Sequence, residues 1–135
     1  MKKELATAWL EAAYSDLSVI KEIINIDYLS NMVAFHSQQA IEKSFKAILE
    51  YFDKHVPKKH NLNALYELVK EDIIIYDTKI LEELNELYID SRYPNSFALM
   101  PHGKPTLDDA KRYYDFADEI FNQVANYLKV DTNFY

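Results

Sequence analysis

Arg92 is the side chain in this sequence whose chemistry is best suited to binding a phosphate group. Its guanidinium is a planar fork of hydrogen-bond donors, which matches the oxygens of a phosphate. A residue that precedes proline leaves the helical region, so Tyr93-Pro94 ends the preceding helix and places Arg92 at the helix end. The alternative is a structural role, in which Arg92 forms an ion pair with Asp16. Both roles are compatible if the ion pair orients the arginine.

Residues 36–60 form a basic segment, with five lysines against three acidic residues and three of the four histidines. His60 follows two lysines and precedes Asn61, which can cap a helix. An imidazole at that position would lie near a helix N-terminus, where anions bind. The alternative is that His60 only closes the helix end. The predicted ligand contacts are Arg92, Tyr93, Lys43 and His60.

His102 could exchange a proton with a phosphodiester while Arg92 stabilises the developing charge, although an ordinary loop histidine is the simpler explanation. The histidines show neither an i,i+4 pair nor the His-Glu spacing of zinc proteases, so we predict no metal site. A chain with one glycine cannot form a Walker-type phosphate loop. No cofactor is therefore expected.

Helical periodicity predicts a cluster of polar side chains on the inner faces of the first two helices. Asp16 interrupts an apolar stripe over residues 4–26 that consists of Leu5, Trp9, Ala12, Val19, Ile20 and Ile23. Gln38 interrupts a second stripe, which consists of Ala34, Ile41, Phe45, Ile48 and Phe52. Glu42 and Lys46 have the favourable i,i+4 order of an ion pair. The predicted cluster is Asp16, Gln38, Glu42 and Lys46, with His36 and Lys43 on the outer side.

The elements that hold these residues are all predicted to be helices. Apolar spacing, caps and prolines predict helices over 4–26, 31–52, 61–70, 77–91 and 106–128, and the run Ile73–Ile75 is expected to be a packed connection. The last helix opens with a capping box of Thr106 and Asp109. We predict an all-α fold, an antiparallel four-helix up-and-down bundle with an additional short helix. It would form a single domain over residues 1–130, followed by a frayed tail at 131–135.

Composition limits the class of protein. The 135 residues contain no cysteine, which excludes a disulfide framework, and the net charge of -7 argues against a general nucleic-acid coat. Neither a signal peptide nor an apolar run of the ~18 residues needed for a membrane span is visible, so a cytoplasmic protein without membrane contact is expected.

Several segments together resemble the HEPN family of small helical domains associated with nucleotides or RNA. The resemblance rests on Ala13–Leu17, Gln38–Lys43, Lys46-Ala47, His60-Asn61-Leu62, Tyr88 and Ser91–Pro94, in this order and spacing. Within the family, the sequence is similar to the branch that is encoded beside a minimal nucleotidyltransferase. The resemblance implies a homodimer with polar residues near a groove and a toxin-antitoxin-type pair with that partner.

Some HEPN branches are metal-independent ribonuclease toxins with an Arg followed by four to six residues and a His. In this sequence nine residues separate Arg92 from His102. Our preferred interpretation is therefore a nucleotide- or RNA-associated binding module that partners a minimal nucleotidyltransferase. The alternatives are a ribonuclease toxin that uses Arg92 and His102, and a structural dimer without a ligand.

Overall fold

The computed structural model describes residues 2–91 and 104–134, and within these ranges it contains helices and no strand. The elements are α1 (Lys3–Ile23), the 3-10 turn η1 (Asp27–Leu29), α2 (Ser30–Tyr51), α3 (Leu62–Val69), α4 (Lys79–Ser91) and α5 (Leu107–Leu128). The predicted all-α class is confirmed, and α3 is the predicted short helix. None of the helices in the described ranges is long and apolar enough to cross a membrane.

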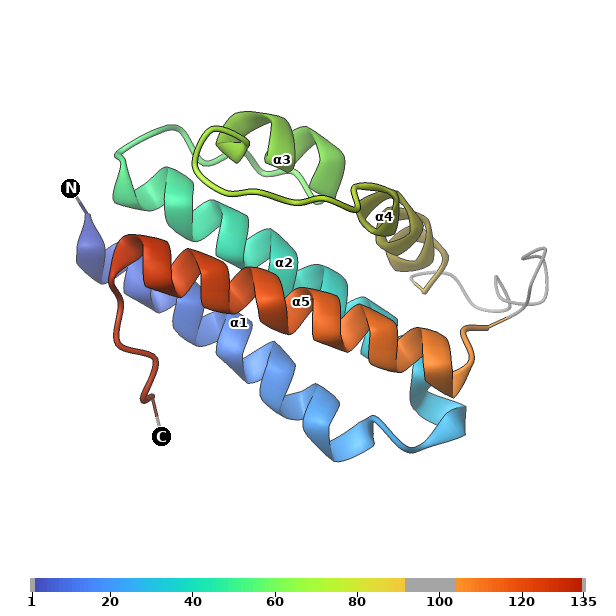
Figure 1. Cartoon of the computed structure of the whole chain (residues 1–135). Helices are drawn as coiled ribbons and strands as arrows, with labels where there is room; N and C mark the ends of the chain where they lie inside the picture. Colours follow the sequence, from blue (N-terminus) through green and yellow to red (C-terminus); the bar gives the residue numbers. More distant parts are fainter. Residues whose placement is uncertain (1, 92–103, 135) are drawn as a thin grey trace.

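Helix α2 is the centre of the fold. Helices α1, α2 and α5 lie side by side, and α3 and α4 pack on α2 away from α1 (Figure 1). The short connection through η1 makes α1 and α2 antiparallel. Helix α4 has 13 residues against 21 or 22 in the three long helices, so the helices are not equivalent. A regular up-and-down order of four long helices stays a prediction.

The buried face of α1 is shifted by one residue from the predicted stripe. Leu5 and Val19 are 47% and 42% exposed, so both were placed wrongly on the inner face. The side chains that are buried are Ala6, Leu10, Ala13, Asp16, Leu17 and Ile20. Two of these residues are alanines, and such small side chains allow neighbouring helices to approach closely. The small residues therefore select the packed face, although they carry little hydrophobic signal.

Helix α2 buries the predicted stripe, with the exception of Phe52, which is partly exposed. Fourteen of its 22 residues are buried, so contacts surround most of the helix. Three of these residues, Gln38, Glu42 and Lys46, are large and polar. Since buried polar groups need partners, the surroundings of α2 must supply hydrogen bonds as well as apolar contacts.

Both predicted helix caps are present. The Asn61 side chain accepts a hydrogen bond from the Ala64 N–H at 2.9 Å, and Thr106 and Asp109 form the reciprocal capping box at 3.0 and 3.2 Å. On α5, Tyr113 is buried, Tyr114 is only partly buried, and Leu107 is 38% exposed.

The segment after α5 lies against the bundle. Val130 is buried, and the rings of Tyr14 and Phe134 meet edge to face with centroids 5.5 Å apart. The single domain over 1–130 and the fraying of 131–135 stay predictions.

Candidate functional site

Asp16 joins α1 to α2 through two ion pairs. Its Oδ1 atom lies 2.8 Å from His36 Nδ1, and its Oδ2 atom accepts a hydrogen bond from Lys43 Nζ at 2.8 Å. His36 and Lys43, which were predicted on the outer side, are 20% and 25% exposed, and from these partly exposed positions they reach Asp16. Because the carboxylate is 10% exposed, its charge is balanced by these two neighbours rather than by water.

Glu42 has an equivalent set of partners at the other end of the site. Its Oε1 atom lies 2.9 Å from His60 Nδ1, and its Oε2 atom accepts a hydrogen bond from Lys46 Nζ at 2.9 Å. The Glu42 and Lys46 side chains are only 5% and 7% exposed. The predicted i,i+4 pair is thus present, and it is deeply buried.

Gln38 connects this buried pair to the loop that precedes α3. Its Nε2 atom donates to the backbone oxygen of His60 at 2.7 Å and to Glu42 Oε1 at 3.2 Å. Its Oε1 atom accepts a hydrogen bond from Gln39 Nε2 at 2.6 Å. These bonds explain why an amide interrupts the apolar stripe of α2.

The two carboxylates orient the two histidines in the same way. An ionised carboxylate can only accept hydrogen bonds, so Nδ1 of His36 and of His60 must be the donor, and Nε2 is the nitrogen that is left for other partners. This is the arrangement by which carboxylates prepare histidines for acid-base chemistry. The imidazole of His60 is 52% exposed and that of His36 is 20% exposed, so His60 is the more accessible of the two.

Two stacked aromatic rings lie between the histidines, and sequence reasoning did not identify them as part of the site. Phe35 and Tyr88 stack with centroids 5.6 Å apart and planes 9° apart. His36 meets Phe35 edge to face at 5.2 Å, and the ring centroid of His60 lies 5.4 Å from that of Tyr88. The sequence signals were the position of Phe35 next to His36 and the presence of Tyr88 among the residues that carry the family resemblance. We call the whole set the α2 strip: Asp16, Phe35, His36, Gln38, Glu42, Lys43, Lys46, His60 and Tyr88.

The structure places the predicted site residues in different ways. Lys43 belongs to the Asp16 end of the α2 strip and His60 to the Glu42 end. Arg92, Tyr93 and His102, and with them the predicted pair of Asp16 and Arg92, lie outside the described residues. Among residues 2–91 and 104–134, no three His, Asp or Glu side chains are arranged to hold a metal ion.

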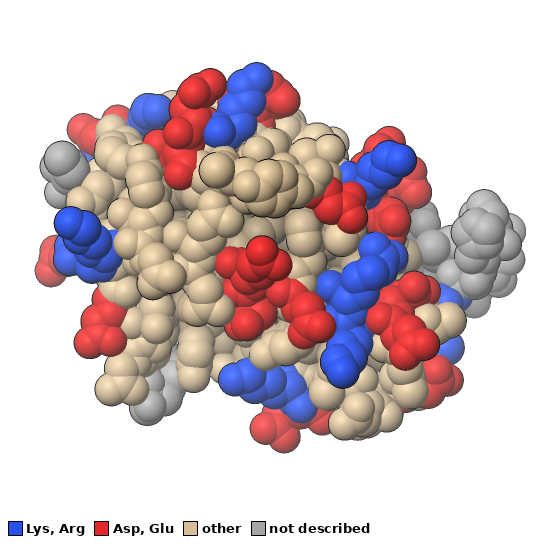
Figure 2. Space-filling view, in the orientation of Figure 1, with Lys and Arg blue, Asp and Glu red and all other residues tan. Residues whose placement is uncertain are grey.

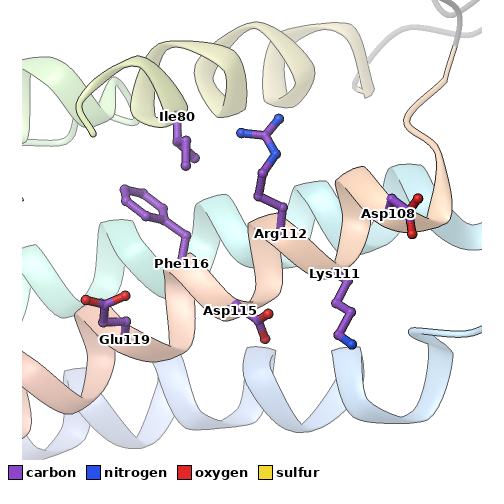
Figure 3. Close-up of a pocket in the computed structure, with 7 residues that line it drawn as sticks. All are labelled: Ile80, Asp108, Lys111, Arg112, Asp115, Phe116 and Glu119. Carbon is purple, nitrogen blue, oxygen red and sulfur yellow. The ribbon is translucent and has the colours of Figure 1, made fainter. Parts of the chain in front are cut away.

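A hollow with a volume of about 420 Å³ lies between α4 and α5, apart from the α2 strip. It is lined by Ile80, Asp108, Lys111, Arg112, Asp115, Phe116 and Glu119 (Figure 3). Arg112 points toward α4, where its Nη2 atom donates to Glu83 Oε2 at 2.8 Å. Acidic and basic side chains also intermingle across this face of the molecule (Figure 2). With its arginine paired and three carboxylates in its lining, the hollow is poorly suited to an anion.

Tyr113 should make the protein less stable at alkaline pH. Burial, together with the hydrogen bond from its hydroxyl to Glu83 at 2.9 Å, raises the pKa of Tyr113. Above pH about 10 the unfolded chain therefore releases a proton that the folded chain retains, and the free energy of unfolding falls by up to about 1.4 kcal/mol per pH unit. Tyr113→Phe should be less stable than the parent at pH 7 and should lose less stability between pH 9 and 11.

Urea unfolding at several pH values measures this effect. Tyr76→Phe, at a position that is 93% exposed, is the matched control and should follow the parent. An identical pH dependence in Tyr113→Phe and the parent would contradict the assignment.

Comparisons with known proteins agree with this all-helical geometry. The sequence model of the HEPN domain matches residues 6–127, so the chain belongs to the HEPN domain family, as the resemblance indicated. The chain is also similar to the protein named "Putative toxin MJ1304" from Methanocaldococcus jannaschii. The two are 28% identical over 137 residues, which cover 92% of this chain and 88% of the relative. No solved structure gives a significant match.

Proposed function

We propose that this protein is a HEPN toxin-like module that binds a nucleotide or single-stranded RNA along the α2 strip. The observation that carries the proposal is the stacked pair of Phe35 and Tyr88 between two carboxylate-oriented histidines. Aromatic rings bind bases without strong sequence preference, and cationic groups beside them bind phosphates. The α2 strip brings both kinds of group together.

Exposure divides the α2 strip into contacting and supporting residues. Lys43 and His60 have 25% and 52% of their side chains exposed, so both can reach a phosphate. Asp16, Gln38, Glu42 and Lys46 are buried, and their role is to orient the exposed groups. Arg92 and Tyr93 follow α4 in the sequence and complete the proposed ligand contacts.

We also propose that the protein forms a homodimer and that its partner is a minimal nucleotidyltransferase in a toxin-antitoxin-type pair. The name of the archaeal relative supports a toxin-like role. Apolar side chains are exposed just after α1, at Ile26 and Tyr28, and at the start of α5, at Leu107, and exposed apolar side chains favour association. Sedimentation of the pure protein measures its mass, and co-purification with a nucleotidyltransferase encoded beside it tests the pairing.

A ribonuclease toxin is the second candidate, and the relative's name is the observation that favours it. In this mechanism Arg92 would stabilise the developing negative charge while His102 transfers the proton. His102 is not among the described residues, so its contribution is tested by mutation.

Binding of a fluorescent single-stranded RNA of about 20 nucleotides, measured by anisotropy over a range of salt concentrations with chelator present, tests these proposals. Affinity should fall as salt rises, and Lys43→Gln should reduce the slope of log affinity against log salt by about 0.7, the value for one phosphate contact. Arg92→Ala should weaken binding while the helical content is retained. Lys21→Gln removes an exposed lysine from α1 and should change neither quantity.

The same samples separate the alternatives. Cleavage of the RNA in chelator that is lost in His102→Ala would establish the ribonuclease and overturn the binding-only function. Absence of salt-dependent binding at micromolar protein would leave a structural dimer. Lys43 pairs with Asp16, so Lys43→Gln also removes an ion pair and lowers stability. The Lys43→Arg variant keeps the positive charge and therefore separates lost binding from lost stability.

A further inference from the structure

A cavity of about 550 Å³ lies beneath the loop between α2 and α3, apart from the α2 strip. Its lining consists of Leu49, Lys54, His55, Pro57, Lys59 and Leu68. None of these residues belongs to the strip. Cavities of roughly 300–1,000 Å³ are typical of sites for small molecules.

The charged groups of this cavity all have the same sign. Lys54 and Lys59 line it together with His55, and none of the lining residues is acidic. The ion pairs of the described part of the chain include Lys43 and Lys46 but neither Lys54 nor Lys59. Lys54 Nζ lies 6.0 Å from the centroid of the Phe52 ring, so its charge has an aromatic neighbour but no acidic one among the described residues. In a protein of net charge -7, two lysines without a described acidic partner beside one cavity provide a local site for an anion.

The remaining lining residues are apolar. Leu49 on α2 is 2% exposed, whereas Leu68 on α3 is 49% exposed. Together with Pro57, these side chains offer an apolar wall that inorganic phosphate alone would not use. The cavity therefore suits a ligand with an anionic head and an apolar body.

Contacts at both ends hold this loop in place. At its start, the Lys54 N–H donates to the Leu49 oxygen at 2.8 Å, and Asp53, at φ 56°, pairs with Lys2 at 2.9 Å. At its end, His60 is bonded to Glu42 through its side chain and to Gln38 through its backbone. A loop that is already ordered loses less entropy when a ligand binds.

We propose that this cavity is a binding site for small phosphate monoesters with an apolar or aromatic body. Lys54 and Lys59 contact the phosphate, and Leu49, Pro57 and Leu68 contact the body. Two ammonium groups balance the charge of a phosphate dianion, and their hydrogen bonds to it are of the stronger, charge-assisted kind. The site is additional to the function proposed for the α2 strip, and it does not depend on that function.

Phenyl phosphate is a suitable probe because it combines the two features. In a titration of the full chain followed by amide NMR, we expect the largest shift changes at Lys54, His55, Lys59 and Leu68. Inorganic phosphate should bind at least about fivefold more weakly, and Lys54→Gln/Lys59→Gln should raise the Kd for phenyl phosphate at least about tenfold. Leu68→Ser should weaken phenyl phosphate binding but not phosphate binding.

Matched variants distinguish a built site from general charge. Lys3→Gln/Lys21→Gln removes the same charge from exposed positions on α1 and should leave the Kd within about twofold of the parent. Equal losses in the two double variants, or shift changes spread over the surface, would overturn the proposal. So would equal affinity for phenyl phosphate and inorganic phosphate. Shift changes confined to the α2 strip would also refute this cavity while leaving the RNA-binding proposal intact.

Discussion

Replacing Glu42 with methionine is expected to lower the free energy of unfolding by about 3–5 kcal/mol, because it removes one partner of a buried ion pair. Lys46 has 7% of its side chain exposed and its Nζ atom lies 2.9 Å from Glu42 Oε2, so its charge would be left without this carboxylate. The nearby ring of Trp9, 5.7 Å from Nζ, supplies a much weaker attraction. Urea unfolding followed by circular dichroism at pH 7 measures the loss.

The double variant Glu42→Met/Lys46→Met separates the cost of an unpaired charge from the cost of lost packing. Since both charges are removed and the side chains keep similar volumes, most of the stability should return. The Asp16→Asn variant is a useful comparison, because its partner Lys43 is 25% exposed and can reach water, so a smaller loss is expected. A double variant as unstable as Glu42→Met would show that the other contacts of Glu42, namely its packing and its hydrogen bonds with Gln38 and His60, matter more than its pair with Lys46.

Phe45→Ala is the second change expected to have a large effect, with a loss of about 3–5 kcal/mol. Phe45 is fully buried on α2, and its ring centroid lies 6.0 Å from that of Tyr66 on α3. Truncation removes the apolar contacts of the ring and leaves a cavity that the surrounding helices cannot fill completely. Thermal and urea unfolding give the change in stability.

Phe116→Ala serves as the control for this truncation. Phe116 lines the hollow between α4 and α5 and is only partly buried, so its loss should cost less than half as much. A loss in Phe45→Ala as small as that in Phe116→Ala would indicate that α2 and α3 close around the missing ring. In that case the core would be more adaptable than its close packing suggests.

The helices themselves could be predicted because their signals are local. The apolar spacing in α2, the cap at Asn61 and the capping box at Thr106 each depend on residues within a few positions of one another. The buried face of α1 could not be predicted as well, because Ala6 and Ala13 carry less hydrophobic signal than Leu5 and Val19. Their small size becomes favourable only when another helix lies against them.

The same distinction explains the candidate site. The pair of Glu42 and Lys46 was predictable because both residues lie on one helix at i,i+4. The contacts of Asp16 with His36 and Lys43 depend on how α1 is rotated against α2, and an error of one residue in α1 turns its face by about 100°. The stacking of Phe35 on Tyr88 likewise requires α4 to be in place. Contacts between helices cannot be derived from the periodicity of either helix alone.

The central position of α2 has a consequence for how this protein unfolds. All the other helices, α1, α3, α4 and α5, pack on α2. Each of them therefore loses part of its buried surface if α2 unfolds. The other helices alone cannot then exclude water from the core. The described helices should therefore form one cooperative unit, in which folded and unfolded molecules coexist without a stable half-folded form.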